Sequence, residues 1–199
     1  MIDTLRDQTG PEDIAVAGLY CDFTIQQEQT TTNIMGAILW QLVGRAGVPK
    51  ELRDAFQKGK TEIGGRGPRL GDLMGMLRVA IALLPRVFIC VDALDECLPK
   101  FLPDLLESLS GIVQECPRTR IFLTGRPHVM GDVQRYFPKA AVVPISPDPD
   151  DIQNYVEMRL DRDDVLGEMS DDLWADIVKI ILAKIPDMCV ESFSTCPYQ

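Results

Sequence analysis

The sequence predicts an α/β fold in which short buried strands of a parallel sheet alternate with amphipathic helices. Short apolar runs rich in β-branched and aromatic residues recur between segments of helical periodicity. The strand–helix order repeats along the chain, which favours parallel strands joined by right-handed crossovers. One strand, 87–91, ends in three carboxylates, Asp92, Asp95 and Glu96. Open α/β folds bind ligands at the carboxyl edge of the sheet, so this edge is the predicted site.

The first half of the chain supplies a strand, a helix and a second helix that leads into strand 87–91. The first strand covers 14–20, and residues 30–33 offer N-cap side chains to the helix that follows. The apolar positions of that helix recur every fourth residue: Ile34, Met35, Ile38, Leu39, Leu42 and Val43. A shorter polar helix is expected over 51–58 and a surface loop over 58–69. An amphipathic helix then runs from Leu70 to Leu84, and Pro85 ends it.

The second half continues the alternation and then becomes helical. A helix with Pro103 in its first turn reaches Val113, and a strand covers 120–123. A helix from about 129 to 136 precedes a strand over 140–143, which Pro144 is expected to end. Apolar periodicity predicts one helix over 152–160 and another over 173–181, capped by Ser170. The segment 189–199 has no periodicity and is assigned to no element.

Composition excludes several classes of function. The net charge of −10 and the lack of a basic patch argue against nucleic-acid binding. Six scattered cysteines without a C-x-x-C pair, and His128 as the only histidine, argue against a zinc site. No apolar run approaches the roughly 20 residues of a membrane span, and no secretory signal is present. We therefore expect a reduced, cytoplasmic protein, in which His128 has a capping or surface role rather than that of a catalytic base.

The acidic end of strand 87–91 has the chemistry of a magnesium and water site. Asp92 is a hard oxygen ligand suited to Mg²⁺ beside nucleotide phosphates, and Asp95 and Glu96 can position an attacking water. Arg126, after the next strand, offers a planar guanidinium that matches a terminal phosphate. Two alternatives remain open: a strand followed by a solvated acidic turn, and a salt bridge from Arg126 to the acidic cluster with no ligand. By contrast, Gly59-Lys60-Thr61 lacks the upstream glycine and strand of a phosphate loop.

Two segments carry a resemblance to a known family. Val-Phe-Ile-Cys-Val-Asp-Ala-Leu-Asp-Glu-Cys, ending at Cys97, looks like the Walker B segment of NACHT-type P-loop NTPases of the STAND class. Ile-Phe-Leu-Thr-Gly-Arg-Pro-His, ending at His128, resembles their sensor 1 segment, with Gly125 where Ser or Cys is more common. Gly-Leu-Tyr-Cys-Asp-Phe and the Ile-Ser-Pro turn are similar to fungal NACHT proteins that often carry ankyrin repeats. The chain also resembles the nephrocystin-like N-terminal domain, over about residues 1–185.

The resemblance implies a cofactor and a set of site residues. The cofactor is Mg²⁺ with ATP or GTP, with Asp92 as the metal-associated acid. Asp95 and Glu96 are the implied hydrolytic pair, and Thr124 and Arg126 the implied nucleotide-binding residues of sensor 1. The implied fold is a three-layer α/β/α sandwich followed by a short helical segment.

The chain departs from this family at both ends. The family's Walker A loop and first strand would precede residues 2–8, so we expect a fragment: a truncated core over 1–146, the start of a helical segment over 147–188 and a divergent tail over 189–199. Without the first strand, two internal edges of the sheet are expected to lie unpaired.

The expected function is that of a fragment of a signalling NTPase. In such proteins nucleotide binding biases a switch between resting and oligomeric states. The implied partners are a weakly held nucleotide, other protein domains and further copies of the chain, with no nucleic acid and no membrane. Without a phosphate loop, we expect no catalysis by the chain alone. The alternative is a non-catalytic interaction module derived from such an NTPase.

Overall fold

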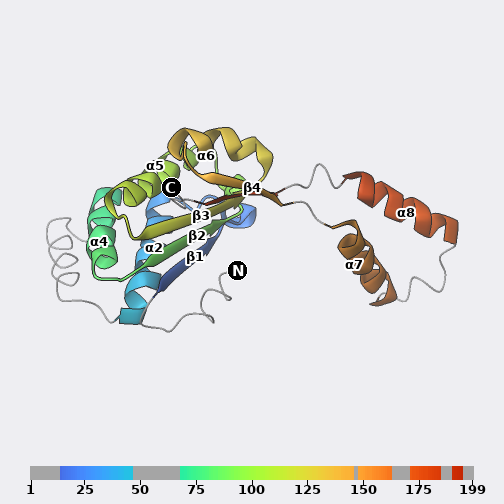
Figure 1. Cartoon of the computed structure of the whole chain (residues 1–199), viewed down its shortest axis with the longest axis horizontal. Helices are drawn as coiled ribbons and strands as arrows, with labels where there is room; N and C mark the ends of the chain where they lie inside the picture. The colour runs from blue at the N-terminus through green and yellow to red at the C-terminus, as the bar shows by residue number, and fades with distance from the viewer. Residues whose placement is uncertain (1–13, 47–67, 146–147, 163–170, 185–189, 195–199) are drawn as a thin grey trace.

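The computed structural model describes residues 14–46, 68–145, 148–162, 171–184 and 190–194. The described sheet has five strands in the order β1-β2-β3-β5-β4 (Figure 1). The strands are β1 (Ala15–Tyr20), β2 (Val87–Asp92), β3 (Thr119–Gly125), β4 (Ala141–Ile145) and β5 (Val190–Ser194). The α-helices are α2 (Thr31–Ala46), α4 (Leu70–Ala82), α5 (Leu102–Glu115), α6 (Met130–Tyr136), α7 (Pro149–Arg162) and α8 (Asp171–Lys184). Single 3₁₀ turns are η1 (Phe23–Ile25), η2 (Leu94–Glu96) and η3 (Pro127–Val129). The predicted helix over 51–58, most of the loop after it and residues 2–8 lie outside the described residues.

Strands β1, β2 and β3 are parallel neighbours, as the alternation of strands and helices predicts. Tyr20 pairs with Asp92 at the end of β1 and β2, and Val91 pairs with Leu123 near the end of β3. The carboxyl ends of the three strands therefore meet at one edge of the sheet. This confirms the mixed α/β fold and brings the end of β2 next to the end of β3.

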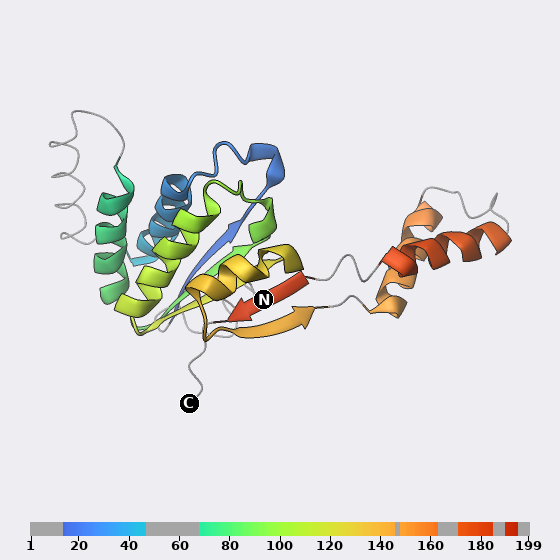
Figure 2. The ribbon, with the colours of Figure 1, turned by 90° about the horizontal axis from the view of Figure 1, so that it is seen from above.

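The apolar core lies between one face of this sheet and helices α2, α4, α5 and α6 (Figure 2). The sheet contributes alternate residues to it, because successive side chains of a strand point to opposite faces. These residues are Ala15, Ala17, Val87, Ile89, Val91, Ile121 and Leu123. The helices contribute the apolar positions that the sequence periodicity predicts, and Ile38, Leu77, Leu105 and Leu109 are fully buried. Strands β1, β2, β3 and β4 follow one another in the same direction across the sheet. Right-handed crossovers between parallel strands therefore place all four connecting helices on the same face.

The helix ends follow the local chemistry of the sequence. The Asn33 N–H donates to the Thr30 hydroxyl at 3.2 Å, which satisfies one of the free donors at the start of α2. The Arg69 N–H donates to the Asp72 carboxylate at 3.1 Å at the start of α4. Pro103 stands in the first turn of α5, where a missing N–H costs nothing.

Strand β1 lies at the edge of the described sheet, and a side chain of α2 covers part of its backbone. The Gln41 side-chain carbonyl accepts from the Gly18 N–H at 2.9 Å, and its NH₂ donates to the Gly18 carbonyl at 2.8 Å. One amide thus takes the place of a neighbouring strand at this position. An edge with satisfied backbone groups is a weaker template for pairing with another chain.

The prediction that Pro144 ends the fourth strand is wrong. Pro144 lies within β4, where it pairs with Glu191 of β5, and the strand continues to Ile145. Strand β4 is the last in the sheet order and pairs with β5 alone among the described strands. A proline that lacks an N–H donor is tolerated on an edge strand, because only one side of that strand must form the ladder.

The sequence assigned residues 190–194 to no element, and the structure places them as β5 between β3 and β4. Phe193 pairs antiparallel with Leu123 on one side and with Val142 on the other. The expected pair of unpaired internal edges is therefore absent from the described sheet, since β5 contributes ladder bonds to both. Strands β1, β2, β3 and β4 run in the same direction, and β5 runs against its two neighbours.

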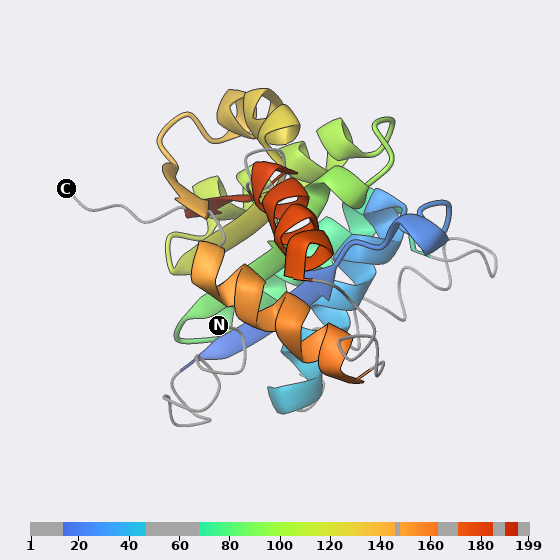
Figure 3. The same ribbon diagram turned by 90° about the vertical axis from the view of Figure 1, so that its right-hand side faces the viewer.

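Helices α7 and α8 pack on each other and project from the end of the sheet between β4 and β5 (Figures 1 and 3). Both helices are predicted by their apolar periodicity. Several of their apolar side chains nonetheless face solvent, among them Tyr155, Leu173 and Ile180. Within the described residues, no helix combines the length and the apolar character needed to cross a bilayer.

Candidate functional site at the carboxyl edge of the sheet

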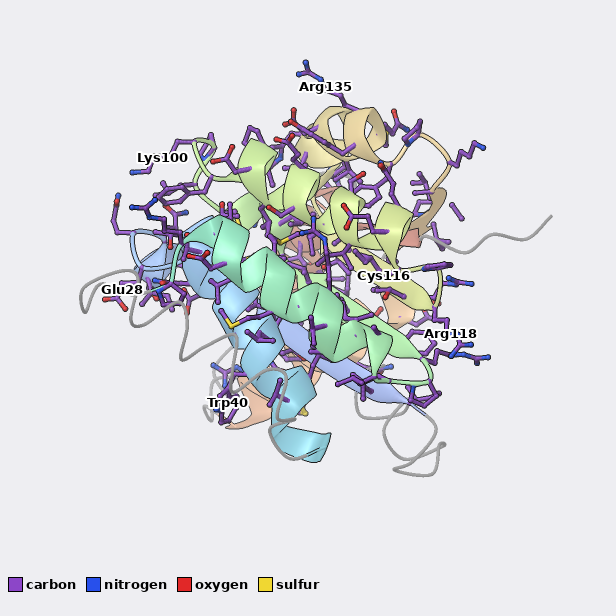
Figure 4. The ribbon with its side chains drawn as sticks, turned by 90° about the vertical axis from the view of Figure 1, so that its left-hand side faces the viewer. Glu28, Trp40, Lys100, Cys116, Arg118 and Arg135 are labelled. Carbon is purple, nitrogen blue, oxygen red and sulfur yellow. The ribbon has the colours of Figure 1, made fainter. Side chains whose placement is uncertain are left out.

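The ends of β1, β2 and β3 bring the predicted site residues to one edge of the sheet. Figure 4 shows this edge on the side of Glu28 and Lys100, whereas Cys116 and Arg118 lie at the opposite edge. The site itself consists of the turn after β2, which contains η2, and the turn after β3, which contains η3.

Asp92, the last residue of β2, is bound to Thr124 on the neighbouring strand. The Thr124 hydroxyl donates to Asp92 Oδ1, and the backbone N–H of Ala93 donates to the Thr124 oxygen at 3.0 Å. Thr124 thus connects the carboxylate with the backbone of the turn that follows it. The two residues were expected at one site from separate motifs, and the structure brings them into direct contact.

The turn after β2 depends on an unusual backbone conformation. Ala93 has φ 57° and ψ 51°, in the left-handed region. This conformation costs a residue with a Cβ roughly 1 kcal/mol or more. It reverses the chain directly after Asp92, so that Leu94 is buried and Asp95 faces the start of η3. The sequence does not indicate this left-handed backbone, because alanine rarely adopts it.

Asp95 binds Arg126 in two ways. Asp95 Oδ1 accepts from the Arg126 backbone N–H at 3.1 Å, and Oδ2 lies 3.3 Å from Arg126 Nε. The Asp95 side chain is only 8% exposed, whereas that of Arg126 is 60% exposed. The structure therefore contains a salt bridge from Arg126 to the acidic cluster, which is one of the two alternatives that the sequence left open. Since the outer part of the guanidinium remains in solvent, it is accessible to an anion.

Gly125, between Thr124 and Arg126, permits the close approach of η2 and η3. A Cβ built at this position would lie 2.8 Å from Val129 Cγ2, 3.4 Å from Leu94 Cβ and 3.6 Å from Asp95 Oδ1. The sequence alone suggested that glycine here is a mild departure from Ser or Cys. In this structure glycine is required for the packing as it stands, because any side chain would displace Val129.

The segment after β1 lies at the same edge as the turns after β2 and β3, and the side chain of Gln29 binds its backbone. Gln29 accepts from the Asp22 N–H at 3.0 Å and donates to the Tyr20 carbonyl at 3.2 Å. Two hydrogen bonds from Thr24 to Asp22 lower the pKa of that exposed carboxyl. No signal in the sequence indicated the role of Gln29, because the contact depends on how the chain folds back before α2.

Cys21 and Cys97 meet beneath this edge, with their sulfur atoms 3.0 Å apart. The hydrogen bond with Cys97 and burial raise the pKa of the Cys21 thiol, and the same hydrogen bond lowers the pKa of the Cys97 thiol. The two cysteines stand 76 residues apart in the chain, so spacing gave no indication of this pair.

The donor groups at the edge fit a water-mediated Mg²⁺ contact. Asp92 and Thr124 place a carboxylate and a hydroxyl side by side, and Mg²⁺ usually takes one or two carboxylates, several waters and phosphate oxygens. In the part of the chain that the structure describes, no three His, Cys, Asp or Glu side chains gather as a metal-binding group. Glu96 is partly buried at the end of η2, and His128 is exposed in η3. The groups therefore suit a cation that arrives with phosphates rather than one held by protein alone.

Comparison with known proteins places the chain in a family. A family model described as "Nephrocystin 3, N-terminal" matches residues 1–126. No curated protein and no solved structure matches the chain. The matched residues include β1, α2, α4, β2, α5 and β3, and hence Asp92, Asp95, Thr124 and Arg126. This chain belongs to the nephrocystin 3 N-terminal family.

Proposed function

We propose that the chain is part of a nucleotide-binding signalling NTPase, with the edge formed by β1, β2 and β3 as its Mg²⁺–nucleotide site. The observation that carries the proposal is the contact between the Asp92 carboxylate and the Thr124 hydroxyl, next to a half-exposed Arg126 guanidinium. Asp92 would hold Mg²⁺ through water, and Arg126 would contact a terminal phosphate. The cation would neutralise phosphate charge. These groups do not distinguish ATP from GTP, because the proposal assigns them to the cation and the phosphates and not to the base.

We further propose that the chain by itself does not hydrolyse nucleotide. Asp95 is 8% exposed and is occupied by Arg126, so it does not face an attacking water. Arg126 in turn must leave Asp95, or share its charge, when it contacts a phosphate. Glu96 alone remains as an acid for positioning water, and catalysis needs such a group within hydrogen-bond reach of the nucleophile. In the complete architecture, nucleotide binding would bias oligomerisation of a cytoplasmic signalling protein.

Isothermal titration calorimetry of the full chain with Mg-ATP and with Mg-GTP tests the nucleotide site. We expect weak binding, in the millimolar range, that Asp92→Asn abolishes. This variant keeps an oxygen for the Thr124 hydroxyl but removes the charge that attracts the cation. The matched control is Glu107→Gln, an exposed carboxyl on α5 away from the edge, which should leave the affinity unchanged. Equal binding by wild type and Asp92→Asn would contradict the proposal.

A second function, that of a non-catalytic interaction module, is favoured by a separate observation. Tyr155 on α7 and Leu173 and Ile180 on α8 are 51–64% exposed. Exposed apolar side chains on a helix pair that projects from the sheet would suit a surface that binds another protein. Sedimentation velocity over a concentration series, with Tyr155→Ser/Ile180→Ser compared with wild type, checks for self-association through this pair. If the chain associates without nucleotide and the double variant does not, this function gains support over the first.

A further inference from the structure

We propose that Cys21 and Cys97 are an oxidation site, at which hydrogen peroxide joins the exit of β1 to the end of η2 through a disulfide. The observation is the 3.0 Å separation of the two Sγ atoms, closer than sulfurs in ordinary van der Waals contact. Both thiols are free. A disulfide bond is about 2.05 Å long, so the sulfur atoms must approach by only about 1 Å.

The backbone around both cysteines holds them in this position. The Cys21 N–H donates to the Asp92 carbonyl at 2.9 Å, which continues the β1–β2 ladder beyond the last strand residue. The Cys97 N–H donates to the Leu94 carbonyl at 3.1 Å and closes η2. The two thiols therefore approach each other from two fixed elements rather than from loops that must first be ordered.

The pair is buried but not completely enclosed. Cys21 is 6% and Cys97 4% exposed, and each is followed directly by a residue that is exposed or partly exposed, Asp22 and Leu98. Cys116 offers a contrast, because it is more exposed and lies at the opposite edge of the sheet (Figure 4). If Cys21 and Cys97 react faster than Cys116, the cause would be the short distance between their sulfur atoms and not greater exposure to solvent.

The chemistry is balanced by one molecule of peroxide. A thiolate of the pair attacks one peroxide oxygen, the O–O bond breaks, and sulfenic acid and hydroxide form. The second sulfur then attacks the sulfenic sulfur, an S–S bond forms, and the S–O bond breaks with loss of a second hydroxide. The two thiol protons neutralise the two hydroxides. In total, two thiols and one hydrogen peroxide give one disulfide and two waters.

The disulfide would alter the edge of the sheet without touching its polar groups. It would link β1 to η2 covalently, and η2 carries Asp95, which binds Arg126. Restriction of η2 should make the Asp95–Arg126 contact more persistent. Oxidation of the pair does not depend on nucleotide binding, since it involves the thiols alone.

Peptide mapping of the full chain tests the proposal. The reduced protein is treated with stoichiometric hydrogen peroxide, trapped with N-ethylmaleimide in urea, and digested without reductant. We expect the Cys21–Cys97 linked peptide to appear before any other cysteine product and to revert with dithiothreitol. In chain unfolded by urea before oxidation, formation of the linked peptide should slow at least about tenfold. The two cysteines are then separated by 76 residues of flexible chain and meet only rarely. Cys116→Ser is the matched control and should form the link at the wild-type rate.

Two results would overturn the inference. One is recovery of Cys21 and Cys97 as N-ethylmaleimide adducts while Cys116 is oxidised. The other is formation of the link at the same rate in the folded and the unfolded chain. Neither readout requires a variant at the pair itself, so a folding defect in Cys21→Ser or Cys97→Ser cannot obscure the answer. As an independent measure, hydrogen exchange at the η2 amides should slow in the oxidised protein and return to its original rate after reduction.

Discussion

Asp95 and Arg126 bind each other across the gap between the turns after β2 and β3, at 3.1 Å through the backbone N–H and 3.3 Å through the guanidinium. The backbone half of this contact does not depend on the side chain at position 126. Arg126→Ala should therefore lower the free energy of unfolding by only about 1 kcal/mol, because the guanidinium that is lost is 60% exposed and the Arg126 N–H still donates to the buried Asp95 carboxylate. Asp95→Ala should cost about 1–3 kcal/mol, since it leaves the Arg126 N–H without its acceptor. Urea unfolding of both variants measures the difference, and equal losses would contradict this account.

Thr124 should stabilise the site through its hydroxyl and not through its methyl group. Thr124→Val keeps the shape but removes the acceptor of the Ala93 N–H and the donor to Asp92, and we expect a loss of about 1–3 kcal/mol. Thr124→Ser retains both hydrogen bonds and should remain within about 1 kcal/mol of wild type. Thermal unfolding followed by circular dichroism compares the two. If Ser proves as costly as Val, packing of the methyl group is the dominant contribution.

Gly125→Ala should destabilise the protein, because the new Cβ meets Val129 Cγ2 at 2.8 Å. Overpacking of this kind typically costs about 1–3 kcal/mol. The double variant Gly125→Ala/Val129→Ala removes Val129 Cγ2, the atom with which the new Cβ clashes. Its loss of unfolding free energy should therefore be smaller than the sum of the losses of the two single variants. A double-mutant cycle on denaturant midpoints measures this coupling. Strictly additive losses would show that the clash is relieved elsewhere.

Ala93→Gly should raise stability, in contrast to most glycine substitutions. At φ 57° a Cβ is unfavourable, and glycine removes about 1 kcal/mol of strain, partly offset by the greater entropy of its unfolded chain. Ala93→Val should lose more than 1 kcal/mol, since branching at Cβ makes the left-handed region still less favourable. The thermal midpoints of the two variants should therefore move in opposite directions. A lower midpoint for Ala93→Gly would contradict the assigned backbone strain.

Gln41 should protect the edge strand β1 from solvent. Gln41→Leu leaves both the N–H and the carbonyl of Gly18 without their side-chain partner. We expect faster hydrogen exchange at the Gly18 amide and a loss of about 1–3 kcal/mol. Gln41→Glu keeps an acceptor for the N–H but not a donor for the carbonyl, and it should slow exchange relative to Gln41→Leu. Unchanged exchange in both variants would show that β1 is protected by other contacts.

The sequence by itself determined most of the helices and parallel strands and the class of fold. Apolar periodicity located α2, α4 and α5, because a helix that buries one face must repeat its apolar residues every three to four positions. Short β-branched runs located β1, β2 and β3, and alternation with helices indicated that they are parallel. Because the carboxyl ends of parallel strands share an edge, the sequence also predicted that Asp92 and Arg126 belong to one site. The resemblance to the nephrocystin-like N-terminal domain is confirmed by the family match.

Tertiary structure decided the contacts that join residues far apart in the chain. The place of β5 between β3 and β4, the pairing of Asp95 with Arg126 and the meeting of Cys21 with Cys97 all depend on which segments lie side by side. Local propensity carries no information on such pairs, since each partner is compatible with many neighbours. Pro144 was misjudged for the same reason, because a proline ends a central strand but is accepted on an edge. The cost of a side chain at Gly125 likewise follows from Val129, four residues later, only once η3 has packed against η2.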